Sequence, residues 1–190
     1  MTVPEPWRLS ELEVAALLEG RHGDPFAVLG PHGVEGGLVV RVLLPGAEAV
    51  ELLDPRGRPL ATLDRRHPDG FFEGLLAGRS APLAYRLRAR FPGATRELED
   101  PYRFGPVLGE RDENLLRVGT DLRLWERFGA RPLVHEGCAG VHFAVWAPNA
   151  SRVAVVGDFN GWDGRVHGMR RRPVSGVWEI FLPGVGEGAR

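Results

Sequence analysis

The chain has 190 residues, of which 43% are apolar and 26% are charged, and its formal net charge is -1. This composition is typical of a globular protein with one large domain or two small ones, and it excludes a disordered or fibrous chain. Nucleic acid is not expected as a partner, because proteins that neutralise phosphate groups usually carry a basic excess.

The sequence also constrains redox chemistry and location. Cys138 is the only cysteine, so an intramolecular disulfide is impossible and a thiolate metal site is not expected. The N-terminal sequence lacks the basic and apolar regions of a secretory signal, and no run approaches the ~18 apolar residues of a membrane span. We therefore expect a cytoplasmic protein without a membrane partner.

A short amphipathic helix is predicted within residues 1–20. Ser10 and Glu13 form a capping box, and Gly20 supplies a C-terminal stop. The residues expected on the buried stripe of this helix are Leu12, Ala15, Ala16 and Leu18.

Short strands separated by turn residues follow in a predicted first β-sandwich module, residues 21–105. Apolar or alternating segments of strand length are bounded by Pro, Gly and Asp, and no helical segment lies between them. This spacing favours an antiparallel sandwich over a parallel α/β fold. The predicted strands are Leu38–Leu44, Glu48–Leu53, Leu60–Leu63, Phe71–Leu76 and Leu83–Phe91.

Residues 106–135 are predicted to form a partly helical bridge. The preceding segment, Asp100–Pro106, should be extended, because proline restricts its own backbone and that of the residue before it. Glu110–Arg117 and Asp121–Phe128 then have apolar residues at helical spacing. We expect this bridge to connect two sandwiches.

An internal repeat predicts the second sandwich module, residues 136–190. Leu38–Leu53 aligns with Val141–Val156 without a gap, and Gly70–Leu76 aligns with Gly176–Leu182. The last strand of the first copy has no counterpart, so we expect an incomplete second sandwich with an open edge and a partly uncovered apolar face. Its predicted strands are Val141–Ala147, Arg152–Val156 and Val177–Leu182.

The predicted fold class is therefore all-β. It consists of two tandem immunoglobulin-like β-sandwiches, with a short N-terminal helix, a partly helical bridge and a second sandwich that is incomplete at its C-terminus.

The loop Gly157–Gly164 is the candidate binding site. It gathers Asp158, Asn160 and Trp162 on one turn after a Val-rich segment. A flat indole beside carboxylate and amide groups suits an uncharged sugar, whose CH face packs on the ring while its hydroxyl groups take hydrogen bonds. The sequence equally allows Trp162 to plug the rim of the sandwich core, so both interpretations stay open.

Two other tryptophans are predicted to be core residues. Trp146 and Trp178 lie within strand patterns, and Phe72 is the counterpart of Trp178 in the first repeat. A large ring that recurs at one position of a repeat is typical of core filling.

The remaining candidate sites are weaker. His22, Asp24 and His32 flank a Gly- and Pro-rich loop, but they match no standard zinc spacing, so neither a metal nor a cofactor is expected. Arg170–Arg172 could hold a phosphate, although a solvated strand edge is the commoner role of such a run. We identify no catalytic arrangement of side chains in the sequence.

Three motifs carry a resemblance that covers nearly the whole chain: His22–His32 (HGDPFAVLGPH), Asp100–Pro106 (DPYRFGP) and Phe143–Asp163 (FAVWAPNASRVAVVGDFNGWD). Together they resemble the N-terminal part of bacterial 1,4-α-glucan (glycogen) branching enzymes of the α-amylase superfamily. The third motif alone is shared with trehalohydrolases, debranching enzymes and free-standing glycogen-binding modules, so the first two single out branching enzymes.

The resemblance implies a role in glycogen biosynthesis. The catalytic barrel of such an enzyme transfers an α-1,4-glucan chain to a 6-hydroxyl group, and this chain lacks that barrel, its expected partner within one polypeptide. Alone it should be inactive, and it would position α-glucan chains through Trp162 and Asn160, with Asp158 as a neighbouring candidate. The alternatives are a stand-alone α-glucan-binding module and a trehalohydrolase fragment.

Overall fold

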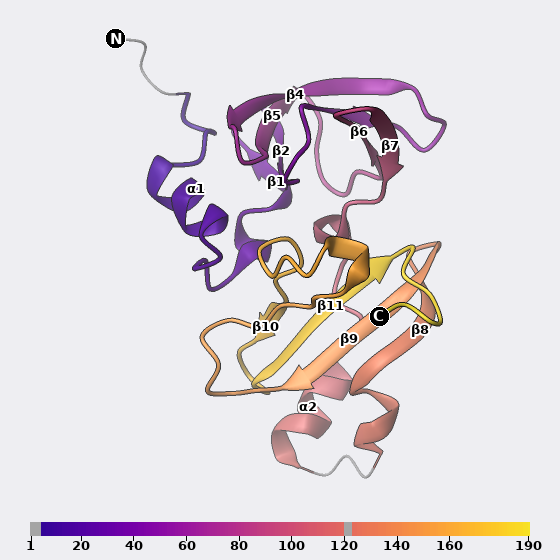
Figure 1. Ribbon diagram of the computed structural model, residues 1–190. Coiled ribbons are helices and arrows are strands. Elements are labelled where there is room, and N and C mark those ends of the chain that lie inside the picture. The colour runs from indigo at the N-terminus through magenta and orange to yellow at the C-terminus, as the bar shows by residue number, and fades with distance from the viewer. Residues whose placement is uncertain (1–4, 120–122) are drawn as a thin grey trace. The chain divides into compact units, whose positions relative to one another are not determined.

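The computed structural model describes residues 5–119 and 123–190, which form two compact units (Figure 1). Unit 1 contains the described residues up to His22 together with Ala27–Arg103. Unit 2 contains Gly23–Phe26 and Phe104–Arg190. Among the described residues, no helix is both long enough and apolar enough to cross a membrane.

Helix α1, Glu11–Leu18, begins where the sequence predicts it. The Ser10 hydroxyl accepts a hydrogen bond from the Glu13 backbone N–H at 3.3 Å, which satisfies a donor that the first helical turn leaves unpaired. Gly20 follows the helix with φ at 67°, a left-handed conformation that costs glycine less than other residues. The predicted cap and stop are confirmed.

The buried face of α1 differs from the prediction. Val14, Leu17 and Leu18 are buried, whereas Leu12 is 85% exposed. The three buried residues follow the i, i+3, i+4 spacing of one helix face, and Leu12, two residues before Val14, lies on the opposite side. The expected burial of Leu12 is therefore wrong, and only Leu18 of the predicted stripe is buried.

Seven antiparallel strands form the sheet of unit 1 in the order β1-β2-β5-β4-β3-β6-β7. The long strand β4 pairs with β3 near its start and with β5 near its end, so it joins the two layers of the sandwich. The strands are β1 (Gly30–Val34), β2 (Gly37–Leu43), β3 (Ala49–Leu53), β4 (Pro59–His67), β5 (Phe71–Ala77), β6 (Arg86–Phe91) and β7 (Ala94–Leu98).

All five strands predicted for this unit are present, and β1 and β7 are additional. Strand β1 (GPHGV) has little apolar alternation and β7 is mostly exposed, so neither has the pattern of a half-buried strand. The core gathers alternate side chains from β2, β3, β5 and β6, including the buried Val40, Leu52, Phe72 and Leu87.

Unit 2 contains a four-stranded antiparallel sheet in the order β10-β11-β9-β8. Its elements are α2 (Glu110–Val118), β8 (Gly129–His135), β9 (Cys138–Trp146), β10 (Arg170–Arg172) and β11 (Val177–Pro183). Short 3-10 helices in the chain span Pro25–Ala27, Pro101–Arg103, Leu124–Glu126 and Asp158–Asn160. Most of the regular secondary structure is strand, in two antiparallel sheets, and the prediction of an all-β fold is confirmed.

Two predictions for unit 2 are wrong. Arg152–Val156 forms one isolated bridge, Ala154 to Gly168, instead of a strand, because its pairing with residues 167–169 rests on two backbone hydrogen bonds, from the Val155 N–H to the His167 oxygen and from the Met169 N–H to the Val153 oxygen. Within Asp121–Phe128, a 3-10 turn at Leu124–Glu126 replaces the expected helix, and residues 121–122 lie outside the described part of the chain.

Strand β8 was not predicted. It lies within residues 106–135, and it pairs with β9 along its whole length. Helix α2 confirms the predicted helix at Glu110–Arg117. The predicted domain boundaries at residues 20, 105 and 135 stay predictions.

Candidate functional site

The loop Gly157–Gly164 is a compact turn whose backbone closes on one carbonyl. The Gly157 oxygen accepts hydrogen bonds from the backbone N–H groups of Asn160 at 3.1 Å and Trp162 at 2.9 Å. Gly161 and Trp162 both have φ at 62°. A positive φ is uncommon for a residue with a bulky side chain, so the contacts around Trp162 must hold it there.

Trp162 presents its indole to solvent. Trp162 is 60% exposed, and its indole Nε1–H donates a hydrogen bond to Asp158 Oδ1 at 2.9 Å. This bond fixes the direction of the ring while most of its surface stays accessible. The alternative, in which Trp162 plugs the core, does not fit this exposure.

Asn160 is occupied at both ends of its amide. Its Oδ1 accepts a hydrogen bond from the Gly157 N–H, and its Nδ2 donates to the Val155 carbonyl oxygen, each at 2.9 Å. Nδ2 also lies 2.9 Å from His167 Nδ1. The structure thus brings Asp158, Asn160 and Trp162 together, with Trp162 and Asp158 exposed and Asn160 partly buried.

His167 is a site residue that the sequence did not indicate. Its ring stacks on Phe159 with the centroids 5.8 Å apart, and its backbone oxygen accepts a hydrogen bond from the Val155 N–H at 3.0 Å. Burial lowers the pKa of His167 to about 4, against a smaller opposing influence from Asp163. His167 is seven positions after Asn160 and lies outside the predicted loop, so no local pattern connected the two residues.

The far end of the loop is held by a second set of polar contacts. Asp163 accepts hydrogen bonds from the backbone N–H and the guanidinium of Arg165 at 2.7–3.1 Å. The side-chain hydrogen bond from Arg165 lowers the pKa of Asp163. Both ends of the loop are therefore tied to neighbouring chain, and Trp162 lies between them.

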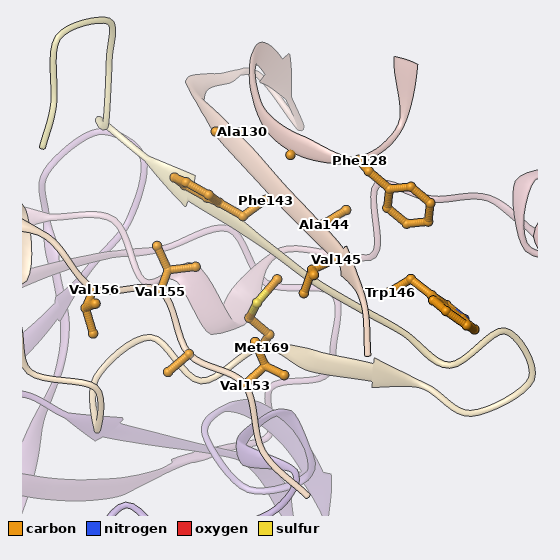
Figure 2. A pocket seen from close by; sticks show the side chains of 12 residues that line it. Phe128, Ala130, Phe143, Ala144, Val145, Trp146, Val153, Val155, Val156 and Met169 are labelled. Carbon is orange, nitrogen blue, oxygen red and sulfur yellow. The ribbon is translucent and has the colours of Figure 1, made fainter. Parts of the chain in front are cut away.

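An apolar hollow of about 620 Å³ lies beside β9 (Figure 2). Figure 2 shows Trp146 at one end and Val156 at the other, with Val145, Val153 and Met169 between them. Its lining residues are all glycine or apolar: Phe128, Gly129, Ala130, Phe143, Ala144, Val145, Trp146, Val153, Ala154, Val155, Val156 and Met169. The expected open edge and partly uncovered apolar face of the second sandwich stay predictions.

The two tryptophans predicted for the core differ. Trp178 is 1% exposed, which confirms its prediction, whereas Trp146 is 65% exposed, so its expected burial is wrong. Trp146 is the last residue of β9, and its Nε1–H donates to the Ser175 carbonyl oxygen at 3.2 Å. At the end of a strand, alternation does not determine which neighbour covers a side chain.

The arginine run of β10 is engaged with protein groups. Arg170 lies over the Phe26 ring at 4.0 Å and donates to the Phe104 carbonyl oxygen at 2.9 Å. Arg172 donates to a carboxylate oxygen of Glu113 at 2.6 Å. These contacts favour a structural role over phosphate binding. Among the described residues, no group of three or more His, Cys, Asp and Glu side chains is placed to hold a metal.

Comparison with known proteins adds two family matches. Residues 10–102 match the family "alpha-1,4-glucan branching enzyme GlgB, N-terminal domain". Residues 127–190 match "Carbohydrate-binding module 48 (Isoamylase N-terminal domain)". The first match includes α1 and the strands of unit 1 up to β7, and the second includes the sheet of unit 2 and the Trp162 loop.

Similar proteins named 1,4-alpha-glucan branching enzyme GlgB include the following three. The protein of Paramagnetospirillum magneticum is 58% identical over 175 residues, covering 92% of this chain and 23% of the relative. The protein of Roseobacter denitrificans is 54% identical over 181 residues, which are 95% of this chain and 25% of the relative. The protein of Pseudomonas aeruginosa is 53% identical over 192 residues, with 99% of this chain and 25% of the relative covered.

This chain thus spans about a quarter of the length of these curated relatives. Its first unit carries the GlgB N-terminal domain, and its second carries a carbohydrate-binding module 48. The chain therefore belongs to the family of the 1,4-alpha-glucan branching enzyme GlgB N-terminal domain, which is followed here by a carbohydrate-binding module 48.

Proposed function

We propose that this chain is the non-catalytic N-terminal region of a glycogen-branching transferase and that unit 2 holds an α-glucan chain against Trp162. The names of the relatives and the GlgB domain match support the first part. The carbohydrate-binding module match supports the second. The catalytic barrel would belong to the rest of the same polypeptide. A cytoplasmic location stays a prediction.

The observation that carries the proposal is the exposed indole of Trp162. Its N–H is already bonded to Asp158, so the ring offers an apolar face in a fixed direction. A glucose unit can pack its CH face on such a ring, and exposed Asp158 can accept hydrogen bonds from hydroxyl groups nearby. Asn160 orients the loop in this proposal, because both ends of its amide have protein partners.

The apolar hollow is a poorer site for a glucan. Sugar hydroxyl groups lose water when they are buried, and they need hydrogen-bond partners in return. The side chains that line the hollow are apolar, and the indole N–H of Trp146 is bonded to Ser175. Trp146 is therefore a matched control for Trp162, since both are exposed tryptophans of unit 2.

Substitution of each tryptophan tests this proposal. Trp162→Ala should weaken maltoheptaose binding at least about tenfold, because it removes an aromatic anchor. Trp146→Ala should leave the dissociation constant within about twofold, since it contributes no stacking surface in this proposal. Isothermal titration calorimetry on both variants measures this. Unchanged binding by the Trp162 variant would refute the site, and weakening by the Trp146 variant alone would move it to the hollow.

The mass of the native protein tests the first part of the proposal. An antibody raised against residues 21–105 should detect a protein several times heavier than 20.9 kDa in the source cells. A band at 20.9 kDa would instead favour a stand-alone α-glucan-binding module.

A further inference from the structure

The contact between Asn160 and His167 determines the protonation state of the histidine. Asn160 Oδ1 accepts from the Gly157 N–H, and Nδ2 donates to the Val155 carbonyl oxygen, so the amide has one consistent orientation. Nδ2 therefore faces His167 Nδ1 at 2.9 Å as a donor. His167 Nδ1 must then be the acceptor, which requires a neutral ring that carries its proton on Nε2.

Burial supports the neutral form of this ring. The pKa of His167 is lowered to about 4, because the charged imidazolium would lose water, although the carboxylate of Asp163 opposes this. At neutral pH the ring is therefore neutral, and the contact with Asn160 Nδ2 favours the tautomer whose Nδ1 is the acceptor.

A short chain of hydrogen bonds leads from His167 to the backbone of Trp162. His167 holds the Asn160 amide, and Asn160 Oδ1 holds the Gly157 N–H. The Gly157 carbonyl oxygen accepts from the Trp162 N–H at 2.9 Å. Because Trp162 has φ at 62°, its backbone needs such restraint to keep the indole in one direction.

The stacked ring of Phe159 gives a second connection. Phe159 precedes Asn160 in the same turn, and its ring lies 5.8 Å from the His167 ring at an interplanar angle of 29°. His167 therefore supports the turn by a hydrogen bond on one edge and by packing on one face.

We propose that His167 is a positioning residue for the glucan-contacting Trp162: its unprotonated Nδ1 accepts from Asn160 and so holds the turn that presents the indole. This inference rests on the proposed function for its biological meaning, but its structural content can be tested without a glucan.

Two variants separate the hydrogen bond from the packing. His167→Phe keeps an aromatic ring against Phe159 and removes the acceptor, whereas His167→Gln supplies a new acceptor without the ring. His67→Phe is the matched control, because His67 Nδ1 accepts a backbone N–H, that of Asp69, at 3.1 Å in unit 1.

The readout is the set of indole N–H signals in a ¹H–¹⁵N correlation spectrum of the full 190-residue chain, which contains five tryptophans. Trp162→Phe identifies the Trp162 signal. His167→Phe should shift or broaden that signal and leave the Trp178 signal in place, and His167→Gln should restore it at least in part. His67→Phe should leave it unchanged. An unaltered Trp162 signal in His167→Phe overturns the inference.

Maltoheptaose binding to the same variants connects the result to function. His167→Phe should weaken binding about tenfold, because an unpaired amide donor loosens the turn. If Trp162→Ala binds as well as the wild type, the proposed function fails, while the indole spectrum still decides the inference. If Trp162→Ala loses binding and His167→Phe does not, the inference alone fails.

A measurement on the unmodified chain covers the case in which His167→Phe does not fold. Long-range ¹H–¹⁵N correlations report which imidazole nitrogen carries the proton. The inference requires an unprotonated Nδ1 and a protonated Nε2 in His167 at neutral pH. A proton on Nδ1 would overturn it.

Discussion

Glu73 in unit 1 and Glu179 in unit 2 align in the repeat, and both are buried in strands with neighbours on each side, β5 and β11. In unit 1, the carboxylate of Glu73 is paired with the guanidinium groups of Arg41, at 3.3 Å, and Arg66. Arg8 lies 3.8 Å away. Oε2 of Glu73 also accepts a hydrogen bond from the backbone N–H of Leu9 at 3.1 Å, directly before the cap of α1.

Glu179 makes the corresponding backbone contacts in unit 2 with fewer cations. Its Oε2 accepts the N–H groups of Val107 at 3.0 Å and Leu108 at 3.1 Å, directly before α2. His142 Nε2 lies 3.0 Å from the same oxygen, and Arg172 Nε lies 3.7 Å from the other. Burial would raise the pKa of Glu179, but the hydrogen bonds from His142 and Leu108 and the charge of Arg172 hold it below its usual value.

The shared part of this arrangement is the anchoring of a helix start by a buried carboxylate. Arg66 also pairs with Glu11 in the first turn of α1, and Arg172 pairs with Glu113 in the first turn of α2. The repeat therefore extends beyond the strands to the helix of each unit. The difference lies in the balance between charge pairing, which dominates around Glu73, and backbone hydrogen bonding, which dominates around Glu179.

The largest expected effect tests this difference directly. Glu73→Gln should destabilise unit 1 by about 3–5 kcal/mol, because it leaves the buried Arg41 without the counter-charge of Glu73. Glu179→Gln should cost unit 2 only about 1–3 kcal/mol, since the amide oxygen can still accept the two backbone N–H groups. Urea unfolding, monitored through the amide NMR signals of each unit, measures both changes in the free energy of unfolding.

A surface carboxylate provides the control for this pair. Glu97→Gln in β7 breaks two ion pairs with a side chain that is 40% exposed, so its cost should stay below about 1 kcal/mol. Equal costs for the Glu73 and Glu179 variants would show that the two anchors work in the same way.

The second prediction concerns local opening. Residues 136–190 border the apolar hollow, whereas the core of unit 1 is enclosed by strands from both layers. We expect the most protected amides of 136–190 to exchange about a hundredfold faster than those of 21–105, because fewer packed side chains oppose opening. Hydrogen exchange with mass spectrometry measures this, and equal protection in the two segments would contradict it.

The third prediction is an opposite response of the two units to acid. In unit 2, the pKa of His167 is lowered to about 4, so between about pH 6.5 and 4 the unfolded state binds a proton that the folded state does not. Between pH 7 and pH 5 this proton uptake should lower the free energy of unfolding of unit 2 by about 2 kcal/mol. The variant His167→Gln should lose this component of the pH dependence.

Asp100 acts in the other direction in unit 1. Burial raises its pKa to about 6, against opposing hydrogen bonds from the Tyr85 hydroxyl at 2.6 Å and the Tyr102 N–H at 2.9 Å. The folded state therefore binds a proton first as the pH falls, and unit 1 should gain about 1 kcal/mol from pH 7 to 5. Asp100→Asn should remove this gain. If the free energy of unfolding varied with pH in the same way in the wild type and in both variants, the comparison would be refuted.

The candidate site was only partly predictable. The residue types of the Gly157–Gly164 turn indicated a sugar platform, and the structure gathers Asp158, Asn160 and Trp162 there. The sequence could not show that the amide of Asn160 is hydrogen-bonded within the turn, nor that His167 contacts this amide. Those contacts depend on where the chain returns after the loop, which no local spacing encodes.

What the sequence alone determined are the features set by neighbours along the chain. The cap at Ser10, the stop at Gly20, the five strands of unit 1 and the burial of Trp178 follow from local dihedral preferences and alternation. The repeat also follows from sequence for β2 and β5, whose aligned segments form β9 and β11, but not for β3, whose counterpart Arg152–Val156 forms an isolated bridge.

Only the tertiary structure decided which surfaces are covered. Leu12 and Trp146 have the same apolar character as their buried neighbours, yet both are exposed. Strand β8 exists because β9 lies beside it, and Glu73 and Glu179 are tolerated in buried positions because cations and backbone donors from distant segments surround them. Burial and pairing depend on residues far apart in the chain, so periodicity can propose a face but cannot say what packs against it.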